Sequence, residues 1–340
     1  MKGRELEILP GGTMSTETTL HSFDSLEESW DALVPDCDVK AFFLSHEWQR
    51  LWWENFGEGR ELLLLAFQQA SEPIGIAPLQ RQNDTISFLG DTDLFDFHDF
   101  IIPEGKENFF YPVLEDYLIS QTWNKLYFPS LPQTSPTLEH LPTIAERQGW
   151  RCQIEQEDVS PSLTLPADWD TYLSGLRKKD RHELRRKLRR LENTGGFEPK
   201  LYTNQIDVSN KLEIFFQLMR KSREDKHHFL TPERESFFRE MAVALAEVGV
   251  LFLWFLEHNG TPVSAALCFD YCGRRLLYNS GFDPEFASLS VGLLLKATCI
   301  RDAIERRLAS FEFLRGDEPY KYHLGGIDQA VYCMTVSKRP

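Results

Sequence analysis

Polar side chains of every type that a group-transfer reaction needs stand close together near the C-terminus, in the string Arg315–His323. The string follows a short apolar segment that we expect to be a strand, and loops at strand ends commonly carry functional residues. Glu318 or Glu312 is suited to accept a proton, and Tyr320 or Tyr322 to donate one. Lys321 completes this candidate catalytic set. The competing interpretation is a structural ion-pair network among Arg315, Glu318 and Lys321.

A second candidate is the acidic cluster DTDLFDFHDF at residues 91–100. Asp96 and its neighbours could orient a substrate amine or hydroxyl, and a carboxylate beside His98 would raise the basicity of that imidazole for proton abstraction. Carboxylate spacings of two and three residues with one histidine match no specific metal-binding loop, so we expect no metal. The alternative is a polar edge strand and turn.

We expect a helix to begin at Ser288–Gly292, because an apolar stripe at helical spacing follows and runs to Ile304. The N-terminus of this helix is suited to bind phosphate. Free backbone N–H groups at the N-terminus of a helix point toward an anion, and Gly292 would let the anion approach. Ser290, Val291, Gly292 and Leu293 could therefore bind the phosphates of a donor substrate. An ordinary helix start capped by Ser288 or Ser290 is the alternative.

The densest charge run is Arg177–Arg190, with nine lysines and arginines against Asp180 and Glu183. Asp180 and Glu183 have the spacing of a capping box, and three leucines give the expected helix one apolar side. Its remaining faces are basic, so a nucleotide 3′-phosphate, an anionic lipid surface or a tRNA acceptor stem could lie along it. The alternative is an ordinary solvated helix.

The elements that must position these residues follow one plan in each half of the chain. Three short apolar segments joined by tight turns occupy residues 62–90, and the same order returns after a shift of about 189 residues, at 251–281. Aromatic-rich helical sequence precedes each set. This pattern indicates an internal duplication. The second half reads as two helices, three antiparallel strands, a helix and a strand, and His227-His228 reads as a loop between the helices.

Composition limits the classes of protein that remain. The chain has 340 residues, of which 42% are hydrophobic, which is enough for two cores. We expect a flexible tail at 1–19, an N-terminal domain at 20–160 and a C-terminal domain at 161–340. No apolar run approaches the roughly 20 residues of a membrane helix. Six scattered cysteines without metal-ligand spacing favour a reducing cytoplasm.

Charge is divided unequally between the halves. Residues 1–170 hold 10 basic against 30 acidic side chains, whereas residues 171–340 hold 27 against 22. A phosphate-bearing partner would therefore dock on the second half. The overall net charge of -15 argues against a DNA-binding protein.

The segment from Tyr278 to Gly325 resembles the acetyltransferase superfamily called GNAT. More narrowly, it is similar to the two-domain branch with CelD-like proteins, BioF2-like acetyltransferase domains and Fem-type aminoacyltransferases. The matching positions are Ser290-Val291-Gly292, Glu312-Phe313-Leu314-Arg315-Gly316, Glu318 and Tyr320-Lys321. Two of them depart from the branch, since Val291 stands for the usual proline and Glu312 for the usual aspartate.

The resemblance implies an α/β protein of two tandem GNAT-like domains, each a mixed, largely antiparallel sheet flanked by helices. It implies an N-acyltransferase that moves an acyl group from acetyl-CoA or a longer acyl-CoA to a small-molecule or lipid-linked amine, in polysaccharide, lipid or cell-envelope biosynthesis. Tyr320 or Tyr322 would protonate the leaving thiolate. We expect the acceptor between the halves, with Asp96, His98 and Asp99 on one side and Glu318, Tyr320 and Lys321 on the other.

Two rival functions remain open at this point. A Fem-like aminoacyltransferase would use aminoacyl-tRNA as its donor, and such enzymes normally present a basic surface. A non-catalytic module of an envelope or polysaccharide system would use the same fold only to bind a ligand or partner.

Overall fold

A computed structural model describes residues 16–37, 39, 41–69 and 72–338 and divides the chain into two compact units. The first unit comprises the chain up to Asp158 together with the segment from Ala330 onward, and the second comprises Val159–Gln329. The C-terminal strand β13 (Ala330–Ser337) therefore belongs to the first unit. Our expectation had assigned all of residues 161–340 to the C-terminal domain.

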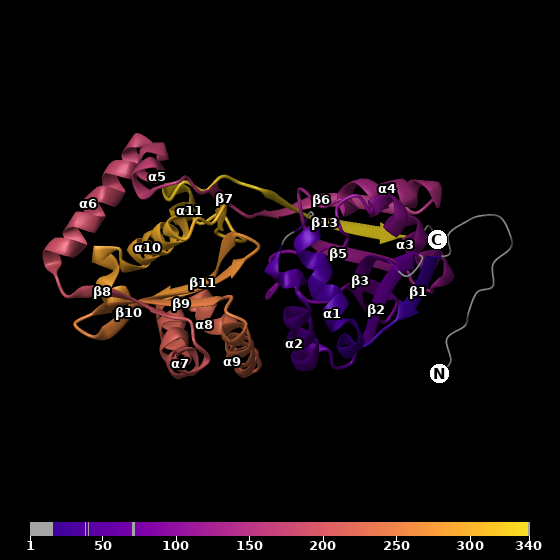
Figure 1. Cartoon of the computed structure of the whole chain (residues 1–340), viewed down its shortest axis with the longest axis horizontal. Helices are drawn as coiled ribbons and strands as arrows, with labels where there is room; N and C mark the ends of the chain where they lie inside the picture. Colours follow the sequence, from indigo (N-terminus) through magenta and orange to yellow (C-terminus); the bar gives the residue numbers. More distant parts are fainter. Residues whose placement is uncertain (1–15, 38, 40, 70–71, 339–340) are drawn as a thin grey trace. The chain divides into compact units, whose positions relative to one another are not determined.

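The first unit is a seven-stranded sheet in the order β1-β2-β3-β4-β5-β13-β6. Helices α3 and α4 cover one face, and α1 and α2 cover the other (Figure 1). The elements besides β13 are β1 (Thr16–Leu20), α1 (Phe23–Leu33), η1 (Val34–Asp36), η2 (Phe42–Leu44), α2 (His46–Phe56), β2 (Glu61–Gln69), β3 (Glu72–Gln82), β4 (Thr85–Phe88), α3 (Glu107–Ser120), β5 (Lys125–Pro132), α4 (Thr137–Arg147) and β6 (Arg151–Val159).

The tail expected at residues 1–19 is in part a strand. Residues 16–20 form β1, which pairs with β2 at the edge of the sheet. Residues 1–15 lie outside the described residues.

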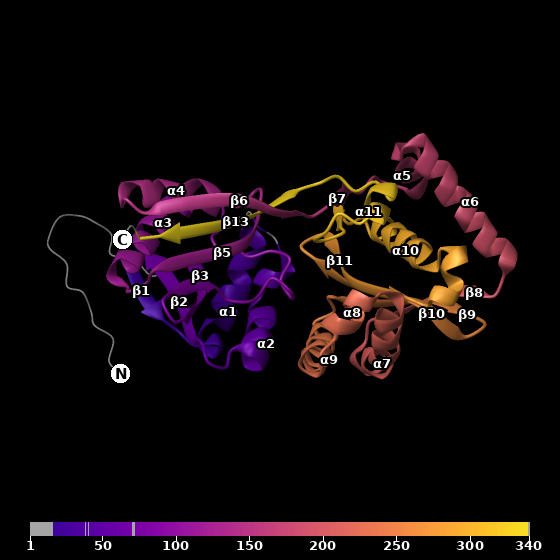
Figure 2. The same cartoon turned by 180° about the vertical axis from the view of Figure 1, so that it is seen from behind.

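The second unit is a six-stranded sheet in the order β7-β12-β11-β10-β9-β8. Helices α7, α8 and α9 lie on one face, and α10 and α11 lie on the other (Figure 2). The elements are β7 (Ser162–Thr164), α5 (Trp169–Gly175), α6 (Lys178–Thr194), β8 (Phe197–Tyr202), α7 (Gln205–Ser222), α8 (Glu224–Phe229), α9 (Pro232–Glu247), β9 (Leu251–His258), β10 (Thr261–Tyr271), β11 (Arg274–Phe282), η3 (Pro284–Leu289), α10 (Val291–Glu305), β12 (Ser310–Glu312) and α11 (Pro319–His323).

The two sheets repeat one topology, as the duplication predicts. In each, an edge strand precedes an antiparallel meander, and the last meander strand pairs in parallel with the strand after the next helix: β4 with β5, and β11 with β12. The parallel strand has a further antiparallel neighbour on its other side. In the first sheet β13, the last strand of the chain, pairs with β5, and in the second sheet β7, the first strand of its unit, pairs with β12.

Local signals explain several element boundaries in the second unit. Thr231 Oγ1 accepts a hydrogen bond from Arg234 N, and Pro232 occupies the first helical position of α9, so these two residues explain where the helix begins. His227 and His228 lie inside the short helix α8, whereas we had expected a loop. None of the described helices is long and apolar enough to cross a membrane.

The second sheet differs from the first by a β-bulge in strand β11. Leu267 faces Asn279 and Cys268 faces Leu277, so Tyr278 is an extra residue on β11. In the first unit the equivalent pairing of β3 with β4 is regular. The partner strand β12 pairs with β11 only from Arg274 to Leu276. Because a bulge bends a strand and interrupts its ladder, β11 beyond Leu276 has an edge that β12 does not cover.

Candidate functional site

The uncovered edge of β11 is occupied by two polar side chains. Asn279 Oδ1 accepts a hydrogen bond from Ser280 N at 2.9 Å and another from Lys226 Nζ at 3.0 Å. Lys226 Nζ also donates to the carbonyl oxygen of Ser280. Both main-chain groups of Ser280 are therefore engaged on the side away from β10. A lysine from α8 and an asparagine from β11 fill the place where a neighbouring strand would pair.

Two lysines of this region have amines with lowered basicity. Burial, and next the positive charges of Lys296 and Arg223, lower the pKa of Lys226 to about 7. Burial also lowers the pKa of Lys296 to about 8. Lys296 lies on α10, where its Nζ is 3.4 Å from Gly292 O and 4.7 Å from the centroid of the Tyr320 ring. Its amine thus contacts both the first turn of α10 and the short helix α11, which follows the loop after β12.

Lys321 organises that loop. Its Nζ donates to the carbonyl oxygens of Leu314, Arg315 and Gly316 at 2.7, 2.6 and 2.9 Å. Leu314 and Gly316 both have positive φ, at 61° and 105°, so the three carbonyls converge in a tight turn. With a side chain only 2% exposed, Lys321 is a structural clamp rather than a group directed at solvent.

Glu318 lies between two cations. Its Oε2 is 2.9 Å from Lys321 Nζ and its Oε1 is 3.6 Å from Arg223 Nη1. Burial acts to raise the pKa of Glu318, but the charge and hydrogen bond of Lys321 outweigh it, and the pKa falls below its usual value. Glu318 is therefore a carboxylate at neutral pH.

The two candidate tyrosines both stay protonated near neutral pH. Burial, and next the charge of Glu318, raise the pKa of Tyr320 well above its usual value. Burial and a hydrogen bond to Asp328 raise the pKa of Tyr322 to about 12. Burial also raises the pKa of Glu312, which accepts a hydrogen bond from Ser310 Oγ at 2.5 Å. Tyr320 shares its charged neighbours Glu318 and Arg223 with Lys226, so these residues form one cluster.

The start of α10 has the open backbone groups that the sequence predicts. Ser290 is left-handed, with φ 58° and ψ 36°, and its side chain makes no capping hydrogen bond. The first amide bonded within the helix is Leu294 N, which donates to Ser290 O, so the N–H groups of residues 291–293 precede the hydrogen-bonded turns. Gly292 has a role we had not expected, because a Cβ there would lie 3.2 Å from the Phe282 ring.

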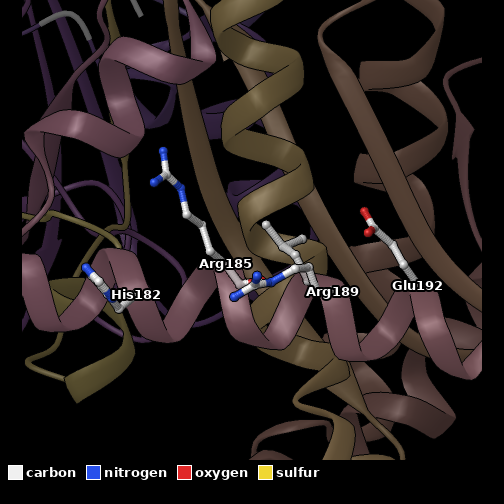
Figure 3. Close-up of a pocket in the computed structure, with 5 residues that line it drawn as sticks. His182, Arg185, Arg189 and Glu192 are labelled. Carbon is white, nitrogen blue, oxygen red and sulfur yellow. The ribbon is translucent and has the colours of Figure 1, made fainter.

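The basic helix α6 borders a cavity of about 510 Å³ that is lined by His182, Arg185, Leu188, Arg189 and Glu192. These side chains project from one face of α6 (Figure 3). Arg190 hydrogen-bonds the carbonyl of Ser288, in the segment just before α10. The cavity-lining arginines are thereby held near the open start of α10.

The predicted capping box at the start of α6 does not form. The N-cap residue is Arg177, and Asp180 instead pairs with Arg177 at 2.6 Å and with His323 at 2.8 Å. Glu183 pairs with Arg186 at 2.7 Å. These ion pairs neutralise part of the charge run, and Arg185 and Arg189 remain on the cavity face.

The acidic cluster of the first unit makes mostly local and core contacts. Asp91 accepts hydrogen bonds from Trp52 Nε1 at 2.8 Å and from two backbone amides. His98 is 1% exposed and stacks between Phe88 and Phe95, with ring centroids 5.8 and 4.6 Å away. Asp99 is also 1% exposed and accepts from Thr137 Oγ1 at 2.5 Å. Asp96 is partly exposed.

In the first unit, the surface where α3 and α4 begin is acidic, unlike the start of α10 in the second unit. A cavity of about 610 Å³ there is lined by polar residues that include Glu107 and Glu139, each in the first turn of its helix. Carboxylates at these positions complement the helix dipole themselves and repel a polyphosphate. The open backbone start of α10 in the second unit has no acidic residue in its first turn.

Sequence reasoning missed Lys226, Asn279 and Lys296. A signal for Lys296 was present, because it lies three residues after Leu293 and four before Ile300, on the apolar stripe of α10. Lysine is rarely buried at a core position unless its amine has a partner, so this position stands out. No pattern marks Lys226, whose contact with Ser280 joins residues 54 positions apart.

Comparison with known proteins agrees with this architecture. Residues 178–322 match the family model described as Acetyltransferase (GNAT) domain. No curated protein matches the sequence. FemX is similar in structure over 94% of this chain and 96% of its own, with a TM-score of 0.64 and 13% identity. A conserved protein of unknown function from Bacteroides thetaiotaomicron covers 95% and 100%, with a TM-score of 0.60 and 11% identity.

A tandem GNAT protein from the clavulanic acid biosynthesis pathway is similar over 96% of this chain and 100% of that chain, with a TM-score of 0.52 and 11% identity. At such identities the likeness shows the fold. The two units share one topology, a mixed and mostly antiparallel sheet between helices, which is the arrangement of a tandem GNAT-like fold. The second unit thus carries a GNAT acetyltransferase domain over residues 178–322, and the chain as a whole has a tandem GNAT-like fold.

Proposed function

We propose that the second unit is an N-acyltransferase that moves an acyl group, most simply acetyl, from a CoA thioester to an amine. The observation that carries the proposal is the position of Lys296. Its Nζ contacts Gly292 O in the open first turn of α10 and the ring of Tyr320 in α11. The open start of α10 and the ring of Tyr320 thus both contact one buried side chain.

The donor would be bound through its phosphates. The backbone N–H groups of residues 291–293 suit the pyrophosphate, since they carry the positive end of the α10 dipole. Arg185 and Arg189 suit a further phosphate in the α6 cavity. Glu107 and Glu139 disfavour a polyphosphate at the corresponding helix starts of the first unit, which supports a single donor site in the second.

The chemistry requires one bond to form and one to break. The neutral acceptor amine attacks the thioester carbonyl, a C–N bond forms, and the C–S bond breaks. The oxyanion of the tetrahedral intermediate would be stabilised by a backbone N–H of β11 other than that of Ser280, which Asn279 already engages. Tyr320, held protonated by its surroundings, would donate a proton to the leaving sulfur. Lys321 and Glu318 would keep the Tyr320 loop in place.

The acceptor would be a small-molecule or lipid-linked amine of polysaccharide, lipid or cell-envelope biosynthesis. An acyl-CoA donor and six free cysteines suit a reducing cytoplasm. We leave His98 and Asp99 out of the proposed site, because both are buried and make core contacts.

One observation favours a second donor. The basic side chains of α6 extend well beyond a single phosphate contact, with exposed Lys178 and Lys179 at its start and Arg185 and Arg189 over the cavity. A tRNA acceptor stem has the repeated phosphates that such a row could bind. The second candidate function is therefore aminoacyl transfer from aminoacyl-tRNA by the same unit.

The experiment compares the donors directly. Purified protein is incubated with acetyl-CoA, longer acyl-CoAs or aminoacyl-tRNA together with a panel of primary amines, and products are identified by mass spectrometry and free-thiol release. We expect an N-acylated amine and stoichiometric free CoA with at least one acyl-CoA. Transfer from aminoacyl-tRNA alone would establish the second candidate, and binding without transfer of any donor would contradict an enzymatic role.

A further inference from the structure

We infer that Lys226 is the catalytic base that takes a proton from the acceptor amine. The inference rests on the proposed acyl transfer and assigns the proton-accepting step to a residue that neither the sequence analysis nor the family match indicated. It begins from the place of Lys226 on the uncovered edge of β11, next to the bulge at Tyr278.

The hydrogen bonds of Lys226 fix the direction of its lone pair. A neutral primary amine has two N–H bonds and one lone pair. Lys226 Nζ has two acceptors, Asn279 Oδ1 at 3.0 Å and Ser280 O, and these use both N–H bonds. The lone pair then points away from both acceptors. An ammonium in the same position would have a third N–H in that direction, so only the neutral amine could accept a proton from that side.

Electrostatics also favours the neutral amine. The charged groups that act on Lys226 are Lys296 of α10, Arg223 and Asp225 at the start of α8, and Glu318 before α11. Burial and the two cations outweigh the two carboxylates and lower the pKa of Lys226 to about 7. At pH 7 to 8 half or more of the molecules therefore carry a basic amine at this position.

The other candidates are less suited to this step. Glu318 is paired with Lys321 and Arg223, and its lowered pKa makes the carboxylate a poor proton acceptor. His228 is exposed, and its Nδ1 contacts Glu224 O within the same short helix. Tyr320 is protonated and suited to act as the acid. Because a general base works best with a pKa near the working pH, Lys226 is favoured over the carboxylate.

The protons balance in this scheme. An acceptor ammonium loses two protons on its way to an amide. Lys226 takes the first, which frees the nitrogen lone pair for attack, and then releases that proton to solvent. The second proton leaves after the C–N bond has formed and restores the hydroxyl of Tyr320, which has protonated the departing sulfur. The net products are the amide, the free thiol and one proton.

The first test measures the amine itself and needs no turnover. Protein labelled with ¹⁵N-lysine is titrated by NMR, and the Lys226 signal is assigned by its absence from Lys226→Met. We expect this amine to titrate near pH 7, as its pKa of about 7 requires. Titration above about pH 9, toward the ordinary lysine value, would overturn the inference whatever the activity of the protein.

The second test is the pH profile of kcat/KM. The wild type should gain activity as the pH rises through about 7, because the deprotonated amine is the active form. Lys226→Met should lose that rising limb and about 10²- to 10⁴-fold in kcat, with donor affinity retained. Lys226→Arg keeps a cation with N–H donors but cannot become neutral, so it should be equally inactive.

Lys221→Met is the matched control, because Lys221 is an exposed lysine of neighbouring α7 whose Nζ contacts Asp283 at 3.0 Å. It should keep the wild-type profile. An active Lys226→Arg, or an activity that falls as the pH rises through 7, would show that Lys226 acts as a cation and overturn the inference. In that case acyl transfer by the wild type would still stand, whereas absence of transfer from every donor would overturn the proposed function itself.

Discussion

Lys321 Nζ lies 2.9 Å from Glu318 Oε2, and the same ammonium donates to three backbone carbonyls of the turn that follows β12. Glu318 and Lys321 were both candidates for catalysis in the sequence. In the structure they hold the loop that carries Tyr320, and this ion-pair network was the competing interpretation of the string Arg315–His323. The two interpretations are compatible if Tyr320 performs the chemistry and Lys321 positions it.

The first prediction concerns that clamp. Lys321→Met should lower the free energy of unfolding by about 1–3 kcal/mol, because buried carbonyls lose their donor. Urea denaturation measures the change, and activity should fall together with stability. Wild-type stability combined with lost turnover would contradict a structural role and return Lys321 to the catalytic groups.

The second prediction concerns the proton donor. Tyr320→Phe should reduce kcat by about 10²-fold while acyl-CoA affinity stays within about twofold, since the hydroxyl acts on the transition state. Tyr322→Phe is the matched control and should keep nearly full activity. Steady-state kinetics with calorimetry separates the two effects. Equal losses in both variants would mean that the loss of Tyr320 only disturbs the loop.

The third prediction concerns the cavity face of α6. Reversing Arg185 and Arg189 to glutamate should weaken donor binding and flatten its dependence on salt, because two phosphate contacts are removed. Lys178→Glu with Lys179→Glu makes the same change in charge at exposed positions that do not line the cavity. Affinities measured across a salt series should therefore differ between the pairs. Identical salt slopes would show that α6 is an ordinary solvated helix.

Much of the fold could be predicted because its signals are local. The apolar meanders, the repeat of their order and the Thr231-Pro232 start of α9 depend on residues close together in the chain. The placement of β13 in the first sheet depends instead on pairing with β5, about 200 residues earlier. No local pattern carries that information, so the expected domain boundary missed the strand.

The candidate site divides in the same way. The open start of α10 and the polar string after β12 were found from sequence because helix starts and strand ends have local signatures. The alternation of aspartates with aromatics around His98 suggested a polar site, but stacking between Phe88 and Phe95 places that ring in a core. Lys226 could not be found, since its role depends on where β12 leaves the edge of β11.

The most direct test of the account is acetyl-CoA affinity at the start of α10, measured by calorimetry for Leu293→Asp and Leu293→Asn. Both variants lose the same partly buried leucine, so they differ chiefly in the charge beside the N–H groups of residues 291–293. Because an acidic residue in the first turn stabilises a helix, a loss of affinity in Leu293→Asp would not come from a weakened helix. We predict that Leu293→Asn keeps most of the wild-type affinity, whereas Leu293→Asp loses at least about tenfold, because its carboxylate repels the pyrophosphate. Equal affinities in the two variants would contradict a phosphate site at this helix start.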